Sequence, residues 1–135
     1  MKNLVTTLLF VLAACTFDRA AAQQLIFADS VQTLRDVAEN DPPVLYRFRY
    51  ENRSEKPVVI LRVDTSCGCV KASFPRKPIA PGESGEIEVR FDPHGHEGAL
   101  YKQMPVYTSG SGNRPAVRLA LSGTIKPPKP RGAAQ

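Results

Sequence analysis

Alternation of apolar and charged residues with a period of two is the feature of this sequence that most constrains its fold. In segment 44–50, apolar and aromatic residues occupy every second position, and Arg47 and Arg49 fall between them. Segments 86–91 and 117–122 repeat the pattern. Successive side chains of a strand point to opposite faces, so this alternation indicates antiparallel sheets with one buried and one solvated face.

Further strands are expected at 24–27, 57–63 and 100–107, separated by loops rich in Gly, Pro, Asn and Ser. Segment 57–63 is apolar on both faces and is expected to lie centrally in its sheet. Segment 34–39 is expected to form at most a helical turn. The sequence therefore predicts an all-β fold, an antiparallel β-sandwich of about seven strands spanning residues 23–125. The expected core includes Phe48, Leu61, Val89, Phe91, Leu119 and Leu121.

The N-terminus has the pattern of an export signal. Lys2 precedes an apolar run over residues 4–14, which is shorter than the roughly 20 residues that a membrane-spanning helix needs. Cleavage before Gln23 would give a signal peptide of residues 1–22. Alternatively, residues 12–15 resemble a bacterial lipobox, in which Cys15 becomes the lipidated N-terminus after removal of residues 1–14 and anchors the chain to a membrane. Both alternatives predict export to the periplasm or the cell surface.

The net charge of +5 is unevenly distributed along the chain. The segment 126–135 carries Lys126, Lys129 and Arg131 among prolines, and we predict a basic, Pro-rich, disordered tail. Within the predicted domain, basic and acidic residues nearly balance and are interleaved. That distribution indicates a solvated surface, so no nucleic acid partner is expected.

Cys67 and Cys69 are separated by Gly68 alone. In an extended strand their Cα atoms would lie about 6.6 Å apart, which is near the upper limit for a disulfide. A turn at Gly68 would shorten this distance at little steric cost. The pair can form a structural disulfide that rigidifies a strand end, or a reducible disulfide with a redox function. We expect the structural role, because the sequence shows no base, acid or substrate groove that turnover would need.

Metal binding is a further alternative for the same cysteines. His94 and His96 lie in the loop 92–98 and could complete a ligand set with Cys67 and Cys69. Two thiolates and two imidazoles suit zinc or copper. A His-Gly-His segment is also an ordinary polar turn, and in that case no cofactor is expected.

Three segments together resemble one known family. They are Tyr-Arg-Phe-Arg-Tyr-Glu-Asn at 46–52, Val-Asp-Thr-Ser-Cys-Gly-Cys at 63–69, and Pro-Ile-Ala-Pro-Gly-Glu-Ser-Gly-Glu-Ile-Glu-Val-Arg-Phe-Asp at 78–92. The chain is similar over residues 25–125 to secreted bacterial proteins grouped as domain of unknown function 1573. The resemblance implies an immunoglobulin-like or major-sperm-protein-like sandwich and an exported protein. It implies no activity.

No phosphate-binding glycine loop or nucleophile elbow occurs in the sequence. We therefore expect a non-enzymatic binding or structural module of the bacterial cell envelope. Its partner would be a protein or another envelope component, because sandwich domains commonly present edges or loops to partners. The alternative is a periplasmic thiol-redox or metal-handling protein that uses Cys67 and Cys69. If the chain is an enzyme, we expect a thiol–disulfide oxidoreductase.

Overall fold

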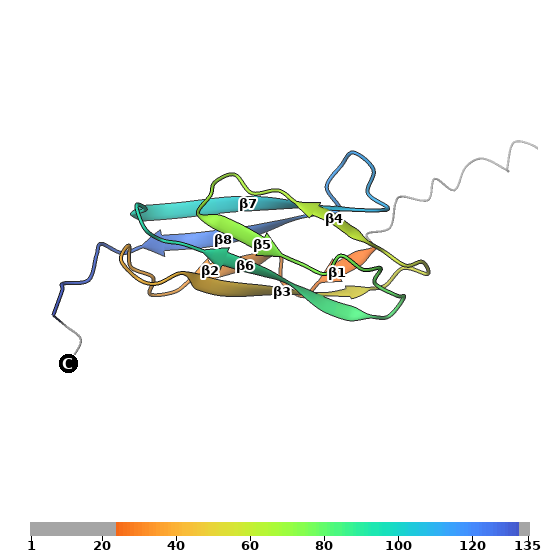
Figure 1. The fold of residues 1–135 in the computed structure, drawn as a ribbon, viewed down its shortest axis with the longest axis horizontal. Helices are drawn as coiled ribbons and strands as arrows, with labels where there is room; N and C mark the ends of the chain where they lie inside the picture. The colour runs from red at the N-terminus through yellow and green to blue at the C-terminus, as the bar shows by residue number, and fades with distance from the viewer. Residues whose placement is uncertain (1–23, 133–135) are drawn as a thin grey trace, which may run out of the picture.

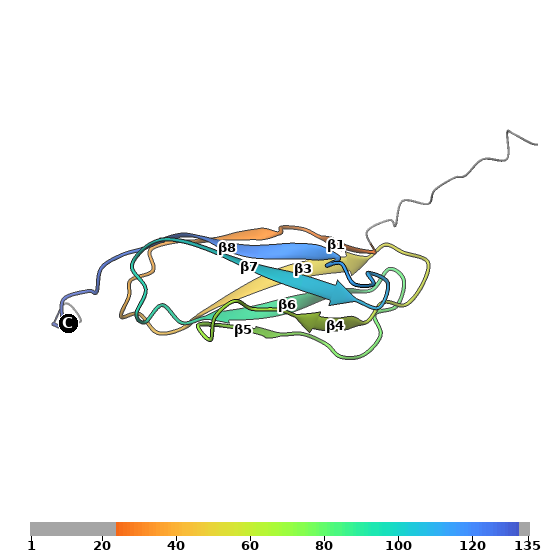
Figure 2. The same ribbon diagram turned by 90° about the horizontal axis from the view of Figure 1, so that it is seen from above.

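A computed structural model describes residues 24–132, and these residues form two four-stranded sheets packed face to face (Figures 1 and 2). Sheet A has the strand order β1-β3-β6-β5, and sheet B has the order β2-β8-β7-β4. The strands are β1 (Leu25–Phe27), β2 (Val31–Leu34), β3 (Val44–Asn52), β4 (Ile60–Val63), β5 (Val70–Ser73), β6 (Ser84–Phe91), β7 (Gly98–Thr108) and β8 (Val117–Ile125). No helix long and apolar enough to cross a membrane occurs within residues 24–132.

The predicted all-β sandwich is confirmed, with eight strands in the described part of the chain rather than about seven. One strand pair departs from the expected antiparallel order, because β2 runs parallel to β8. The short connection between β1 and β2 transfers the chain from one sheet to the other. The amide of Ala28 still donates to Arg49 of sheet A at 3.0 Å, whereas the carbonyl of Ser30 already accepts from Ala120 of sheet B at 2.8 Å.

The core between the sheets contains the alternating residues that the sequence predicts, except Leu61. Five of the six expected core residues are buried: Phe48, Val89, Phe91, Leu119 and Leu121. Leu61 is 52% exposed, so this expectation is wrong. The register of β4 against β7 shifts between Ile60 and Arg62, and this β-bulge accompanies the outward position of Leu61.

Segment 57–63 is not a central strand, which corrects a second expectation. Its first part contributes only an isolated bridge between Val58 and Ile79, and its second part, β4, is the edge strand of sheet B. Val58 and Ile60 are both buried although their segment lies at an edge. Segment 57–63 is apolar because it covers the side of the core. Its amino-acid composition is also typical of a strand in the middle of a sheet, so composition does not distinguish the two positions.

The segment expected to form a helical turn is irregular. Leu34 ends β2, and Asp36 adopts a left-handed backbone conformation with φ of +55°. By contrast, a regular turn forms at Pro81-Gly82. The amide of Glu83 donates to the carbonyl of Ala80 at 2.9 Å, and Gly82 has φ of +78° as the third position of a type II turn requires.

The first residues of the predicted disordered tail are bound to the domain, which corrects that expectation in part. Lys129 donates through its backbone amide to Asn40 at 2.8 Å and through Nζ to Asp41 at 2.6 Å. Lys126 contacts Asp36 at 2.6 Å. The start of the tail is therefore bound to segment 36–41. The tail then leaves the sandwich at the end that lies opposite β1 (Figure 1).

Candidate functional site

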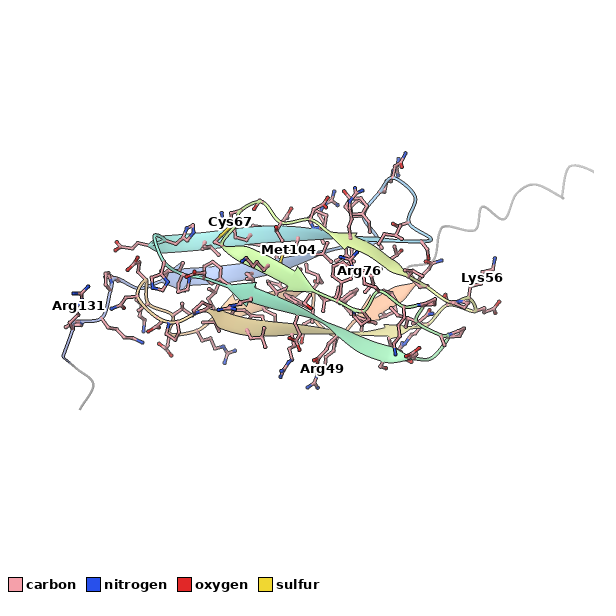
Figure 3. All side chains as sticks on the ribbon, in the orientation of Figure 1. Arg49, Lys56, Cys67, Arg76, Met104 and Arg131 are labelled. Atoms are coloured by element: carbon pink, nitrogen blue, oxygen red, sulfur yellow. A yellow bond between two sulfur atoms is a disulfide. The ribbon has the colours of Figure 1, made fainter. Side chains whose placement is uncertain are left out.

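The two neighbouring cysteines lie in the connection between β4 and β5 (Figure 3). The amide of Val70 donates to the carbonyl of Cys67 at 3.3 Å, which closes a turn with Gly68 and Cys69 at its centre. The turn brings the two Cα atoms to 5.3 Å, and the two sulfur atoms form a disulfide. A Cβ added at Gly68 would meet nothing within 4 Å, so the turn projects into solvent.

Two cationic side chains stand next to Cys69. Its carbonyl accepts a hydrogen bond from the amide of Asp92 at 2.8 Å, which fixes the turn against the end of β6. Two positions further along each segment, Lys71 lies directly opposite Arg90, and both are exposed on the outer side of sheet A. These groups surround a depression of about 160 Å³ lined by Pro43, Gly68, Cys69, Lys71, Arg90 and Asp92.

The two histidines have different neighbours. His94 Nδ1 lies 2.6 Å from Asp92 Oδ1. This hydrogen bond raises the pKa of His94 and lowers the pKa of Asp92. His96 instead packs against Phe91, with ring centroids 6.1 Å apart.

A metal ligand set does not form from the predicted side chains. Within residues 24–132, no three His, Cys, Asp or Glu side chains are grouped so that they could hold a metal ion. The structure therefore does not assemble the zinc or copper ligand set suggested by Cys67, Cys69, His94 and His96. The predicted lipidation site, Cys15, and the signal peptide lie outside the described residues.

The outer face of sheet A is a charged, solvated surface. Arg47 Nε lies 3.3 Å from Glu86 and 3.6 Å from Glu88, and Arg49 faces Glu86 across the strand pair. Both glutamates thus occupy the solvated face that the alternation in segment 86–91 indicates. In Figure 3, Arg49 projects away from the sandwich, whereas Met104, which is fully buried, lies between the sheets.

The outer face of sheet B differs in composition. The four strands of sheet B contain no Asp or Glu, and two basic residues, Arg62 and Arg118, lie on this face, whereas Lys102 pairs with the buried Leu121 and lies on the inward side of β7. Three large apolar or aromatic side chains are also exposed there: Val31 at 48%, Leu61 at 52% and Tyr101 at 60%. Sequence inspection missed this face, because it depends on which strands share a sheet.

Aromatic and amide groups on this face are held in place by neighbours. The guanidinium of Arg62 lies 3.8 Å from the ring centroid of Tyr107, and its Nε lies 3.2 Å from Asp64, which follows β4. The amide of Gln103 donates to the hydroxyl of Tyr101 at 3.3 Å. We call the surface formed by Leu61, Arg62, Tyr101, Gln103, Pro105, Tyr107 and Arg118 the sheet B face.

A sequence model of the family described as "Protein of unknown function (DUF1573)" matches residues 25–125. No curated protein matches the chain. The family resemblance expected from the three sequence segments is therefore confirmed.

Solved structures with the same fold come from distant proteins. The PapD-like domain 7 of human CEP192 superposes with a TM-score of 0.64 at 10% identity, over 86% of this chain and 94% of that chain. A protein of unknown function from Porphyromonas gingivalis W83 gives 0.62 at 14% identity, over 82% of this chain and 51% of that one, so the chain spans about half of its length. SSP-19, an MSP-domain protein like family member of Caenorhabditis elegans, gives 0.50 at 11% identity, over 72% and 94%. At these identities the likeness concerns the fold alone, which is an immunoglobulin-like sandwich of the PapD-like and MSP type.

Proposed function

The chain belongs to the protein family of unknown function DUF1573, and we propose that this member is a non-catalytic binding module exported to the bacterial cell envelope. It binds a protein partner through the sheet B face. The complementary surface of that partner is apolar at its centre and acidic at its rim.

The single observation that carries this proposal is the absence of acidic residues from all four strands of sheet B. Arg118 is exposed on this face and makes no ion pair within the described part of the chain. A partner with acidic groups opposite Arg118 would match the charge of the face. Such complementarity mainly speeds association and selects the partner.

The apolar side chains of the same face supply a reason for stable binding. Each Å² of apolar surface removed from water contributes about 25 cal/mol, and Leu61 and Tyr101 are more than half exposed. Tyr and Arg are also the residue types that interfaces favour. Covering the outer face of sheet A would desolvate two ion pairs, those of Arg47 with Glu86 and with Glu88, whereas the sheet B face contains one, that of Arg62 with Asp64, and desolvating ion pairs is costly. The sheet B face is therefore the better docking surface.

A binding module agrees with the immunoglobulin-like fold that this chain shares with PapD-like and MSP domains. Export is supported by the signal-like sequence of residues 1–22 alone. Expression of the full chain in a bacterial host, followed by fractionation and intact mass measurement, tests this part. A mature N-terminus at Gln23, or at a lipidated Cys15, is the expected outcome. An unprocessed chain in the cytoplasm would contradict export.

Site-specific photocrosslinking tests the docking face. A photoreactive phenylalanine replaces Tyr101 on the sheet B face or, as a matched control, Leu45 on the outer face of sheet A, which is 47% exposed. In the source organism, we expect a discrete crosslinked protein from position 101 and none from position 45. Arg118→Glu should weaken the crosslink, and the captured surface should be acidic. Equal crosslinking from both positions, or crosslinking from position 45 alone, would reject the sheet B face.

A further inference from the structure

We propose that the turn formed by Cys67, Gly68 and Cys69 is a thiol–disulfide exchange site that reacts preferentially with thiols carrying negative charge. This activity lies beyond partner docking and uses the opposite sheet. The reacting molecule is a small acidic thiol or a cysteine flanked by acidic groups, because both present the same chemistry to the site.

The disulfide is accessible from solvent. Gly68 is exposed and its added Cβ would meet no atom within 4 Å, so the approach to the disulfide over the turn is open. Cys67 and Cys69 are both half-buried, with one side against the core. Cys69 also lines the depression of about 160 Å³ at the end of sheet A. A thiol therefore has a path to this disulfide, unlike one enclosed in a core.

Two cationic residues line the depression beside the disulfide. Lys71 and Arg90 are directly opposed across β5 and β6, and like charges in that arrangement are unfavourable. Neither side chain makes an ion pair among residues 24–132. The acidic lining residue, Asp92, is hydrogen-bonded to His94, and Arg90 contributes to its lowered pKa without forming an ion pair with it. An anion forming beside Lys71 and Arg90 would relieve their repulsion.

The two cysteines differ in their surroundings. Nearby Lys and Arg residues stabilise a thiolate, and Cys69 is the cysteine that shares the depression with both cations. Cys69 is therefore the better leaving group, since a stabilised thiolate departs faster. The attacking thiolate then bonds to the sulfur of Cys67.

The reaction balances with an external thiol as reductant. A first thiolate attacks Cys67 Sγ, the Cys67–Cys69 bond breaks, and its electron pair leaves on Cys69 as a thiolate beside Lys71 and Arg90. A second thiolate attacks the external sulfur of the mixed disulfide and releases Cys67 as a thiolate. Two thiols are thereby oxidised to one disulfide, and the protein disulfide is reduced to two thiols. The same steps in reverse reoxidise the protein.

The test compares two small probes, 2-mercaptoethanesulfonate, which is anionic, and 2-mercaptoethanol, which is neutral. The full mature chain is mixed with each thiol, quenched with acid, alkylated and analysed by peptide mass spectrometry. We expect the anionic thiol to open the disulfide about tenfold faster than the neutral thiol, as local positive charge raises encounter rates by at least this factor. The mixed disulfide should be on Cys67 and the alkyl group on Cys69. High salt should reduce the preference.

Two matched double variants isolate the cation pair. Lys71→Gln with Arg90→Gln should abolish the preference for the anionic probe. Lys77→Gln with Arg114→Gln removes the same charge from exposed positions away from the depression. This control should leave the preference for the anionic probe unchanged. The oxidised peptide of residues 65–71 contains the same Cys67–Cys69 disulfide without Arg90. It therefore measures the preference for the anionic thiol that the disulfide has outside the folded domain. All four substituted residues are exposed, so the variants should remain folded, and circular dichroism checks this.

Three results would overturn the proposal. One is the same ratio of rates in the wild type, in both double variants and in the peptide. Another is a mixed disulfide located on Cys69. The last is a wild-type chain whose two thiols stay free under an oxidising disulfide such as the bis-sulfonate form of the anionic probe.

Discussion

Asn52 should be among the most sensitive positions in the domain, although it is polar. It is fully buried at the end of β3. Its amide nitrogen donates to the carbonyls of Lys56 and Ile79, both at 2.9 Å. Its side-chain oxygen accepts from the amide of Ser54 at 2.9 Å and from the hydroxyl of Ser54 at 2.7 Å. One side chain thus holds the β3–β4 loop and the segment before β6 together.

Asn52→Ala removes all four hydrogen bonds, and their burial sets the cost. The carbonyl of Ile79 keeps its hydrogen bond from the amide of Val58 at 3.0 Å, so losing the buried bond from Asn52 costs about 0.5–1.5 kcal/mol. The other three groups are part-buried and can recover water, at about 0.5–1 kcal/mol each. We therefore expect a loss of about 2–4 kcal/mol in the free energy of unfolding.

Urea unfolding of wild type, Asn52→Ala and Ser54→Ala measures this cost. Ser54→Ala keeps the bond to Ile79 and should lose only about 1 kcal/mol. Asn52→Asp should be at least as harmful as the alanine variant, because a carboxylate oxygen would face the carbonyls of Lys56 and Ile79. A loss below about 1 kcal/mol for Asn52→Ala would refute the reasoning, since it would mean that the loop closes without these bonds.

Three other predictions concern packing and charge. Phe91→Ala empties a fully buried site and should cost about 3–5 kcal/mol in urea unfolding. Gly123→Ala places a Cβ 2.8 Å from that of Leu34, so it should lower the stability by about 1–3 kcal/mol in the same assay. NMR titration should find the pKa of His94 above its ordinary 6.5, and Asp92→Asn should lower it. The contribution of His94 to folding stability is complete below about pH 6.5 and is lost as the pH rises through the raised pKa of His94. The contribution of Asp92 is lost as the pH falls through the lowered pKa of Asp92.

The sequence predicts the long strands well, because their side-chain pattern depends only on the period of two. Strands β3, β6 and β8 fall where the alternation indicates. The short strands β2 and β5 have four residues each, too few for a period to be distinct. The outward position of Leu61 depends on a bulge, and a bulge is set by the register against β7 rather than by local composition.

The candidate sites also differ in how far the sequence predicts them. The cysteine turn could be recognised from the sequence, because its residues are adjacent along the chain. Its cationic neighbours could not, since Lys71 meets Arg90 only through the pairing of β5 with β6. The acid-free composition of sheet B appears only when β2, β4, β7 and β8 are known to share a sheet. Asn52 was missed because an asparagine at a strand end usually indicates an exposed turn.

The two proposed sites should act independently, because the backbone on each side of the cysteine turn is fixed to a different sheet. The amide of Asp64 donates to Pro105 of β7 at 2.9 Å, whereas the carbonyl of Cys69 accepts from Asp92 after β6 at 2.8 Å. Opening the disulfide breaks neither bond, so the turn can be reduced without displacing the sheet B face. Crosslinking from position 101 should therefore be equal in reduced and oxidised chains. A marked difference would mean that the turn transmits its redox state to the docking face through the segment 64–69.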